Sequence, residues 1–214
     1  MTVTDAMAAR RSIRAYKQDA VDEVVIMEII EKASRTPSWA NTQPWEVFVA
    51  AGETLDRIRQ GYADNYKNAV KAAPDISRPS EWPQAAKGRT MQLRPDMLRD
   101  CGEAADQFGE MNQKLFNAPA VIFLCLDKGY SQWSLYDLGA FAQSLVLLAQ
   151  ERGLSTIPAI TSVLYPDVLR HEMSIPGNLN VAIGIPIGYA DEKNGLNNFH
   201  SARKPIDETV TFCP

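Results

Sequence analysis

The stretch Pro119-Ala-Val-Ile-Phe-Leu-Cys-Leu126 is the part of the sequence that decides the fold. It is apolar almost throughout, and such a strand is usually buried on both faces of its sheet, with helices above and below. Cys125 lies inside this run, and we interpret it as a small buried hydrophobic side chain rather than a reactive thiol. The stretch therefore predicts the central strand of a sheet that is covered by helices.

Helical and extended patterns alternate on both sides of this strand. Residues 135–152 form the most apolar helix candidate, typical of a central helix or one at a subunit interface, and Gly153 closes it where a positive φ is favoured. The remaining periodicities predict helices over 21–34, 52–73, 96–116 and 165–173, strands over 45–51 and 180–187, an extended stretch over 155–160 and an edge strand over 209–212. No composition break divides the chain, so we expect a single α+β domain over residues 1–214.

Residues 74–95 lack periodicity and contain four prolines. They are too long for a routine connection, so we expect an irregular insertion that is either mobile or functional, and an active-site lid is the functional interpretation. Residues 78–100 also carry five basic side chains that could pair with a carboxylated aromatic compound, although an ordinary charged loop explains the same composition. At the other end, residues 197–214 are expected to form a C-terminal arm.

Composition excludes several classes of function. The 214 residues include two histidines and three cysteines without a C-x-x-C pair, which argues against metal sites, hydrolytic His/Cys chemistry and disulfide scaffolds. The net charge of −4 gives no nucleic-acid footprint, and neither a signal peptide nor an apolar run of about 18–20 residues is visible. We therefore expect a cytoplasmic protein without a membrane or nucleic-acid partner. If it is an enzyme, a bound group rather than a side chain performs the difficult step.

Two small basic clusters lie near the ends of the chain. In Arg10-Arg-Ser-Ile-Arg14, an extended backbone would direct Arg10, Ser12 and Arg14 to one side, and two guanidinium groups beside a hydroxyl suit a phosphate. The second cluster is Phe199-His-Ser-Ala-Arg-Lys-Pro205. For both clusters, a solvated basic surface is the alternative interpretation.

A third motif, Thr36-Pro-Ser-Trp-Ala-Asn-Thr-Gln-Pro-Trp45, places short polar side chains between two indoles. Amides can hydrogen-bond the edge of a flat heterocycle, and an indole can stack on its face. The alternative is a loop that caps a helix, with Trp45 in the core.

Taken in order, these motifs resemble the FMN-dependent nitroreductase family. The resemblance rests on Arg10-Arg-Ser-Ile-Arg14, Pro37 to Trp45, Gly184-Ile-Pro-Ile-Gly-Tyr189, and Ser201-Ala-Arg-Lys-Pro205 followed by Thr209-Val-Thr-Phe212. It covers almost the whole chain. It implies an α+β fold with a central mixed, largely antiparallel sheet flanked by helices, in an interlocked homodimer that binds one FMN per subunit between the two chains.

The resemblance also implies the site residues. FMN would contact Arg10, Arg11, Ser12 and Arg14 of one chain, with Ser201 and Arg203 closing the phosphate end, and Pro37, Ser38, Trp39 and Asn41 of the partner chain. Pro158, Ala159 and Ile160 would run along the flavin, with the Ile160 N–H directed at N5. Family members often carry Lys or Arg at position 201 and Glu-Gly at 160–161, so a contact at 160 is expected from the backbone. Arg14 is our candidate for the positive group near the N1–O2 edge.

The implied function is that of an NAD(P)H oxidoreductase in which the flavin N5 carries the hydride and no catalytic side chain is required. NADPH or NADH would reduce FMN and leave, and a nitro-aromatic or quinone-like acceptor would follow in a ping-pong cycle. Three alternatives stay open at this point. They are a dehalogenating or flavin-fragmenting member of the same scaffold, a non-catalytic flavin-binding protein, and a flavin-free protein whose basic arms bind an acidic partner or nucleic acid.

Overall fold

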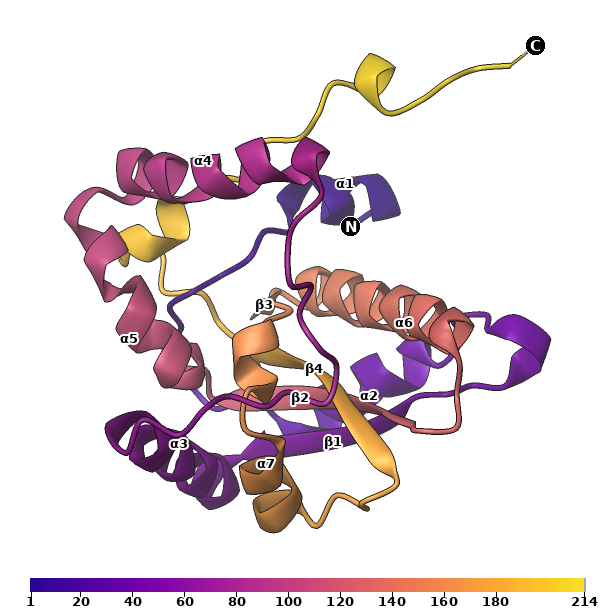
Figure 1. Ribbon diagram of the computed structural model, residues 1–214, viewed down its shortest axis with the longest axis vertical. Helices are drawn as coiled ribbons and strands as arrows, with labels where there is room; N and C mark the ends of the chain where they lie inside the picture. The colour runs from indigo at the N-terminus through magenta and orange to yellow at the C-terminus, as the bar shows by residue number, and fades with distance from the viewer. Residues whose placement is uncertain (214) are drawn as a thin grey trace.

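The computed structural model describes residues 1–213, and its centre is the predicted apolar strand (Figure 1). This strand, β2 (Ala120–Asp127), is buried from Ala120 to Leu126. It pairs antiparallel with β1 (Glu46–Ala51) on one side and β4 (Leu179–Gly188) on the other, and β4 pairs with β3 (Ser155–Thr156). The order is β1-β2-β4-β3, and a parallel contact occurs at the isolated bridge between Ser12 and Thr156. The largely antiparallel sheet is thus confirmed.

The side chains of β2 divide between two hydrophobic cores. Ile122 and Leu124 pack on one face of the sheet, whereas Val121, Phe123 and Cys125 pack on the other. Cys125 is fully buried, and burial raises the pKa of its thiol to about 12. The interpretation of Cys125 as a buried hydrophobic side chain is confirmed.

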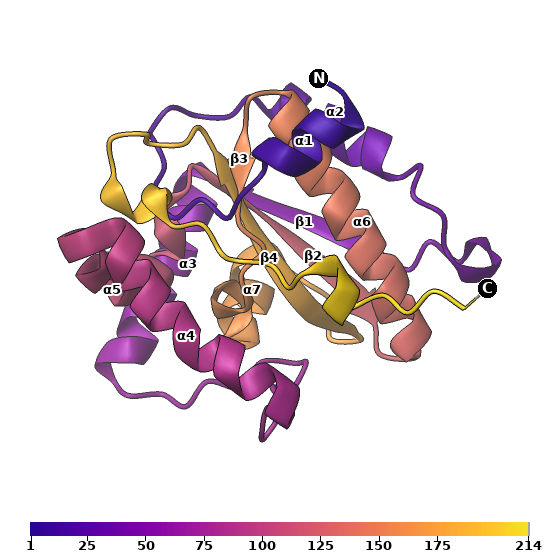
Figure 2. The ribbon, with the colours of Figure 1, turned by 90° about the horizontal axis from the view of Figure 1, so that it is seen from above.

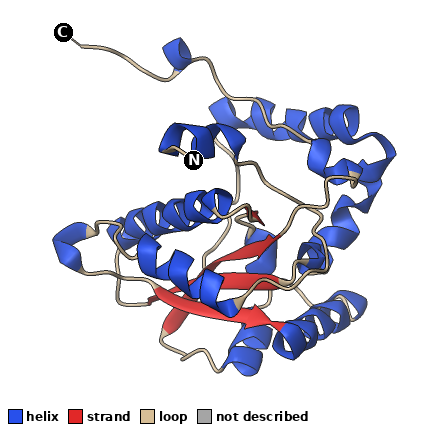
Figure 3. Cartoon of the chain, turned by 180° about the vertical axis from the view of Figure 1, so that it is seen from behind, coloured by secondary structure: helices blue, strands red, loops and turns tan. Residues whose placement is uncertain are grey.

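Helices cover both faces of the sheet, as the α+β prediction requires. Figures 1 and 3 show α2 (Glu23–Ala33) and α6 (Gln132–Glu151) on one side, and α3 (Gly52–Lys67) and α7 (Pro166–Met173) on the other. α6 ends before Gly153, whose φ of 73° is the left-handed conformation that the sequence predicted. Among residues 1–213, no helix combines the length and the apolar character that a membrane span needs.

The predicted irregular insertion over 74–95 is wrong in its second half. Helix α4 (Gln84–Cys101) begins within it and continues through Pro95. A proline removes one backbone hydrogen bond without unfolding a helix whose far end is packed, and here Met97 and Cys101 pack against Phe199. The predicted helix over 96–116 is also wrong as a single element. It breaks at Gly102, which has a φ of 56°, into 3₁₀ turns and α5 (Phe108–Gln113).

The two chain ends also differ from the sequence prediction. Helix α1 (Val3–Ala9) was not predicted, although Thr2 and Asp5 form a capping box that begins it. Residues 209–212 form no strand and are exposed, because an edge strand requires a paired neighbour and no strand of residues 1–213 pairs with them. Short 3₁₀ helices complete the described structure at Trp39–Asn41, Gly102–Gln107, Leu115–Asn117, Ile160–Val163, Gly195–Asn198 and Ile206–Glu208.

Candidate functional site

One buried side-chain amide joins the two basic segments of the chain. Asn197 is 2% exposed, and its Oδ1 accepts the backbone N–H groups of Arg14 at 2.7 Å and Ala15 at 3.2 Å. Its Nδ2 donates to the carbonyls of Ala15 at 2.8 Å and Asp191 at 3.0 Å. The N-terminal segment is therefore fixed beside the C-terminal segment, although more than 180 residues separate them in the sequence.

A hollow of about 260 Å³ opens where these segments meet, and we call it the basic hollow. Guanidinium groups and hydroxyls dominate its lining, and no carboxylate is among the residues that line it: Arg10, Arg11, Ser12, Gln143, Val146, Thr156, Pro158, Ser201 and Arg203. Three guanidinium groups beside three hydroxyls form a strong donor set for phosphate oxygens. The structure thus brings together Arg10, Arg11, Ser12, Pro158, Ser201 and Arg203 of the predicted site.

Arg203 is held at this hollow by its own loop. Its Nη1 donates to the Ser201 hydroxyl at 2.7 Å and to the carbonyls of Ser201 and Ala202 at 3.0 and 3.1 Å. The loop keeps the guanidinium close to its backbone and preorganises it for a ligand, which lowers the conformational entropy lost on binding.

Arg14 departs from the predicted arrangement. It does not line the basic hollow; its guanidinium lies over the rings of Phe108 and Phe199 at 5.7 and 5.1 Å and donates to the carbonyl of Ser12 at 2.9 Å. Side chains alternate only in a regular strand, whereas this segment pairs through isolated bridges. The prediction that Arg14 faces the same side as Arg10 and Ser12 is wrong. Burial lowers the pKa of Arg14, and its buried Nε has no hydrogen-bond partner within residues 1–213.

The turn at Pro158 to Ile160 borders the basic hollow. Ala159 is buried and donates its N–H to the carbonyl of Gly184 on β4 at 2.8 Å. Gly184 is required at this contact, because a Cβ there would lie 2.5 Å from the Cβ of Ser162. Ile160 is 42% exposed, and its N–H has no hydrogen-bond partner in the described part of the chain.

The loop at residues 37–41 lies elsewhere, beside a second hollow of about 600 Å³ that we call the aromatic hollow. It is lined by Pro37, Ser38, Trp39, Trp133, Tyr136 and Asp137. The backbone of this loop is strained, because the non-glycine residues Ala40, Asn41 and Gln43 all have positive φ. Within the loop, the Asn41 N–H donates to the Ser38 carbonyl, and the Trp39 N–H donates to the Asp137 carboxylate at 3.1 Å.

Helix α6 contributes lining residues to both hollows, so its rise per residue gives their separation along the helix. Gln143 lines the basic hollow, and Asp137, which accepts the Trp39 N–H, lines the aromatic hollow. These residues are six positions apart, or roughly 9 Å along a helix that rises 1.5 Å per residue. One chain therefore holds the two halves of the predicted site at different places. Trp45 follows the loop and stacks on Phe141 at 4.6 Å, so its alternative interpretation as a core residue is confirmed.

Comparison with known proteins identifies the family. A model of the nitroreductase family matches residues 7–189, which is most of the chain. The chain belongs to the nitroreductase family. The basic hollow, the turn at 158–160 and the strained loop at 37–41 are accordingly features of a nitroreductase-family oxidoreductase.

Related proteins cover almost the whole nitroreductase-family chain. A chloronitrobenzene nitroreductase from Comamonas testosteroni is 27% identical over 98% of this chain and 96% of its own length. A 4-nitrobenzoate reductase from Pseudomonas putida is 29% identical over 92% and 89%. The crystal structure of NfnB from sphigopyxis sp. strain HMH, described as an FMN and NADPH-dependent nitroreductase, superposes with a TM-score of 0.92 at 25% identity, covering all of both chains.

Sequence reasoning missed Asn197. Nothing next to it in the sequence indicates that it hydrogen-bonds residues 14 and 15. The only local signal was its place beside a basic cluster in a non-periodic segment.

We expect Asn197→Ala to lower the free energy of unfolding by about 2–4 kcal/mol, because several buried backbone groups lose their partners. Asn197→Asp retains the acceptor but loses both donated bonds, so we expect an intermediate loss. Urea unfolding at fixed protein concentration measures both. The control is Asn198→Ala, at the adjacent exposed residue. If Asn198→Ala lowered the free energy of unfolding as much as Asn197→Ala, the role assigned to the Asn197 amide would be contradicted.

Proposed function

We propose that this protein is an FMN-dependent NAD(P)H oxidoreductase that reduces nitro-aromatic compounds. The basic hollow carries the proposal, because three guanidinium groups and three hydroxyls converge there without a carboxylate in the lining. Such a donor set suits the terminal phosphate of FMN. The names of the relatives, including an FMN and NADPH-dependent enzyme, point to the same chemistry.

Two further donors fit a flavin ring system rather than a free phosphate. Arg14 has a buried Nε without a partner, and a buried donor without an acceptor is costly, so its guanidinium would gain by turning from Phe108 and Phe199 toward a ligand oxygen. The Ile160 N–H is also unpartnered within residues 1–213, and Ile160 is two residues from Pro158, which lines the hollow. We propose that Arg14 lies at the N1–O2 edge of the ring and that the Ile160 N–H reaches N5.

When bound, FMN would supply the hydride-transfer chemistry, and the chain would supply binding, orientation and electrostatic tuning. We propose that the nicotinamide donor, NADPH or NADH, and the acceptor use the same face in turn, which is a ping-pong scheme, and that quinone-like acceptors are also reduced. The three cysteines are free thiols, which fits a reducing compartment, and we propose a cytoplasmic location.

We also propose that the active form is an interlocked homodimer. None of residues 37–41 lines the basic hollow, and Trp39 bonds Asp137, about 9 Å along α6 from Gln143, so a second copy would bring Pro37, Ser38, Trp39 and Asn41 to the flavin. Trp39, Trp133 and Tyr136 line one hollow and expose 68%, 69% and 75% of their surface, and clustered exposed aromatic side chains of this kind mark interaction surfaces.

The C-terminal arm supports this assembly. Figures 1 and 3 show it leaving the body of the molecule, with Val210 and Phe212 exposed. β1 is the outer strand of the sheet on its side, and no strand of residues 1–213 covers its free edge. We propose that residues 209–212 of one copy pair with β1 of the other, as the sequence prediction of an edge strand requires.

The lid predicted from the sequence corresponds largely to helix α4, which lies at the side of the molecule in Figure 2. Lys87 pairs with Glu81 at 3.7 Å, whereas no ion pair of the described chain involves Arg89 or Arg94. Arg89 lines a hollow against the C-terminal arm, and Arg94 lines one against α5. We propose that these two arginines favour carboxylated acceptors.

The purified protein should take up FMN and show the yellow flavin spectrum, which NADPH should bleach without oxygen and 4-nitrobenzoate should restore. Arg10→Ala with Arg203→Ala should weaken FMN binding at least about tenfold per arginine, because each loses a charge-assisted hydrogen bond. Flavin fluorescence titration measures this, with Arg57→Ala on α3 as the control. A protein that takes up no FMN, or a double variant with unchanged affinity, would contradict the assignment.

Light scattering should give twice the mass of one chain. Val210→Ser with Phe212→Ser should shift the mass toward one chain, because both side chains lie on the same face of the proposed strand. Thr209→Ser with Thr211→Ser, on the opposite face, is the matched control. A monomeric wild-type protein would disprove the homodimer.

Arg89→Gln and Arg94→Gln should each raise the KM for 4-nitrobenzoate by about two- to fivefold, the range of an exposed ion pair, and leave that for nitrobenzene unchanged. Lys87→Gln is the control, since Lys87 already has a partner. Equal effects on both substrates would rule out selection by charge.

A further inference from the structure

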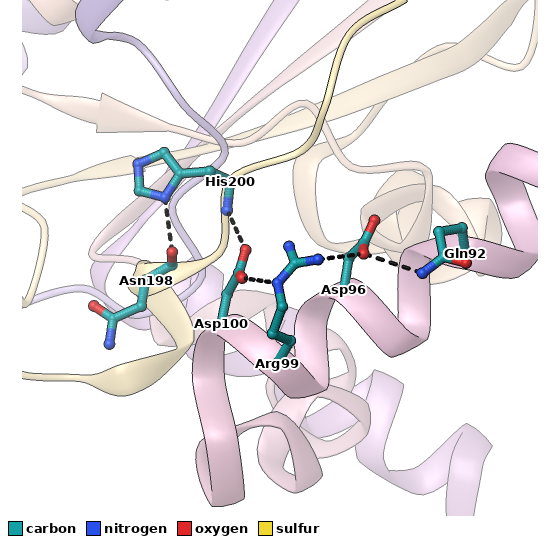
Figure 4. A network of polar contacts seen from close by, with 6 residues as sticks. All are labelled: Gln92, Asp96, Arg99, Asp100, Asn198 and His200. Carbon is teal, nitrogen blue, oxygen red and sulfur yellow. Dashed lines mark hydrogen bonds and ion pairs between the residues drawn. The ribbon is translucent and has the colours of Figure 1, made fainter.

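His200 lies between two partners that together fix its protonation state. Its Nδ1 is 2.7 Å from the carbonyl oxygen of Asn198, and its Nε2 is 2.8 Å from Nη1 of Arg11. Figure 4 shows the first contact, together with the link from the His200 backbone to α4. The second contact reaches a residue that lines the basic hollow.

The chemistry of the two partners allows one arrangement of protons. A carbonyl oxygen only accepts, so Nδ1 must carry the hydrogen, and a guanidinium group only donates, so Nε2 must present its lone pair. His200 is therefore the neutral Nδ1–H tautomer. Because its proton is directed to Asn198 and its lone pair to Arg11, the ring is arranged to hold a neighbour rather than to donate a proton to a substrate.

A neutral acceptor has a specific advantage beside an anion site. A carboxylate would hold Arg11 equally well but would offset its charge, whereas imidazole fixes the guanidinium and leaves the charge available.

The nearby carboxylates are directed elsewhere. Asp100 accepts from Arg99 at 2.8 Å and from the backbone N–H of His200 at 3.3 Å, and Asp96 accepts from Arg99 and Gln92 (Figure 4). Asp100 therefore holds the segment that carries His200, Asp96 bonds only within α4, and neither carboxylate contacts Arg11.

We propose that His200 is a positioning residue that holds Arg11 at the phosphate end of the flavin site and thereby favours the phosphorylated flavin. This inference rests on the proposed function, and it adds a residue, together with its tautomer and its role. The contact acts only on the phosphate, so its loss should affect FMN and spare riboflavin, which has the same ring system without the phosphate.

The experiment compares the dissociation constants of FMN and riboflavin by flavin fluorescence. His200→Ala should weaken FMN binding about two- to tenfold, the range for one hydrogen bond, and leave riboflavin binding unchanged. His200→Gln should retain wild-type affinity, because its amide oxygen can accept from Arg11. His171→Ala, at the other histidine of the chain, is the matched control and should change neither constant.

A double-variant cycle and a spectrum complete the test. In an Arg11→Ala background, His200→Ala should cause no further loss, because the residue acts through Arg11. The ¹⁵N spectrum of the ligand-free protein at mildly alkaline pH should show the Nδ1–H tautomer for His200, assigned by its absence in His200→Ala.

Equal losses for both flavins, additive losses in the cycle, a glutamine variant as weak as the alanine variant, or an Nε2–H tautomer would each overturn the proposal. A wild-type protein that binds neither flavin would instead overturn the proposed function, and the positioning role with it. Failure of the positioning role is therefore seen in the variants or in the His200 tautomer, whereas failure of the proposed function is seen when the wild-type protein binds no flavin.

Discussion

The side-chain amide of Asn197 is the constraint on which the candidate site depends. An amide has two donors and an acceptor with two lone pairs, and the bonds to Arg14, Ala15 and Asp191 use all of this capacity. Burial of such a group is costly unless it is satisfied, so the same bonds that offset the burial fix the register of two distant segments. The basic hollow lies where these two segments meet, and they supply its Arg10, Arg11 and Arg203.

The sequence predicted those elements whose signal is local. The apolar run at 119–126 predicted β2, because burial on both faces leaves no polar position in the strand. It did not predict that α4 continues through Pro95, since packing of Met97 against Phe199 outweighs one lost hydrogen bond and involves residues far away in the chain. Helix α1 was detectable, because the threonine and aspartate of its capping box are three residues apart.

For the site, the sequence predicted which residues come together better than it predicted where each side chain points. Arg10, Ser12 and Arg203 come together as the phosphate interpretation requires, but Arg14 turns toward two aromatic rings because its segment is not a regular strand. The roles of Asn197 and His200 depend on hydrogen-bond partners more than 180 positions away in the sequence. Periodicity and motif spacing do not reveal such partners. Residues 37–41 lie apart from the basic hollow, at a distance that only the folded helix α6 defines.

The basic hollow also has a consequence for the order of events during synthesis. Its lining begins at Arg10 and ends at Arg203, so no shorter nascent chain contains the whole donor set. Arg10 and Arg11 emerge from the ribosome first and stay solvated until Ser201 and Arg203 follow, about 190 positions later. A ligand that needs both segments is therefore acquired only after Arg203 has been translated, when all four strands of the described sheet, the last of which ends at Gly188, have been translated as well.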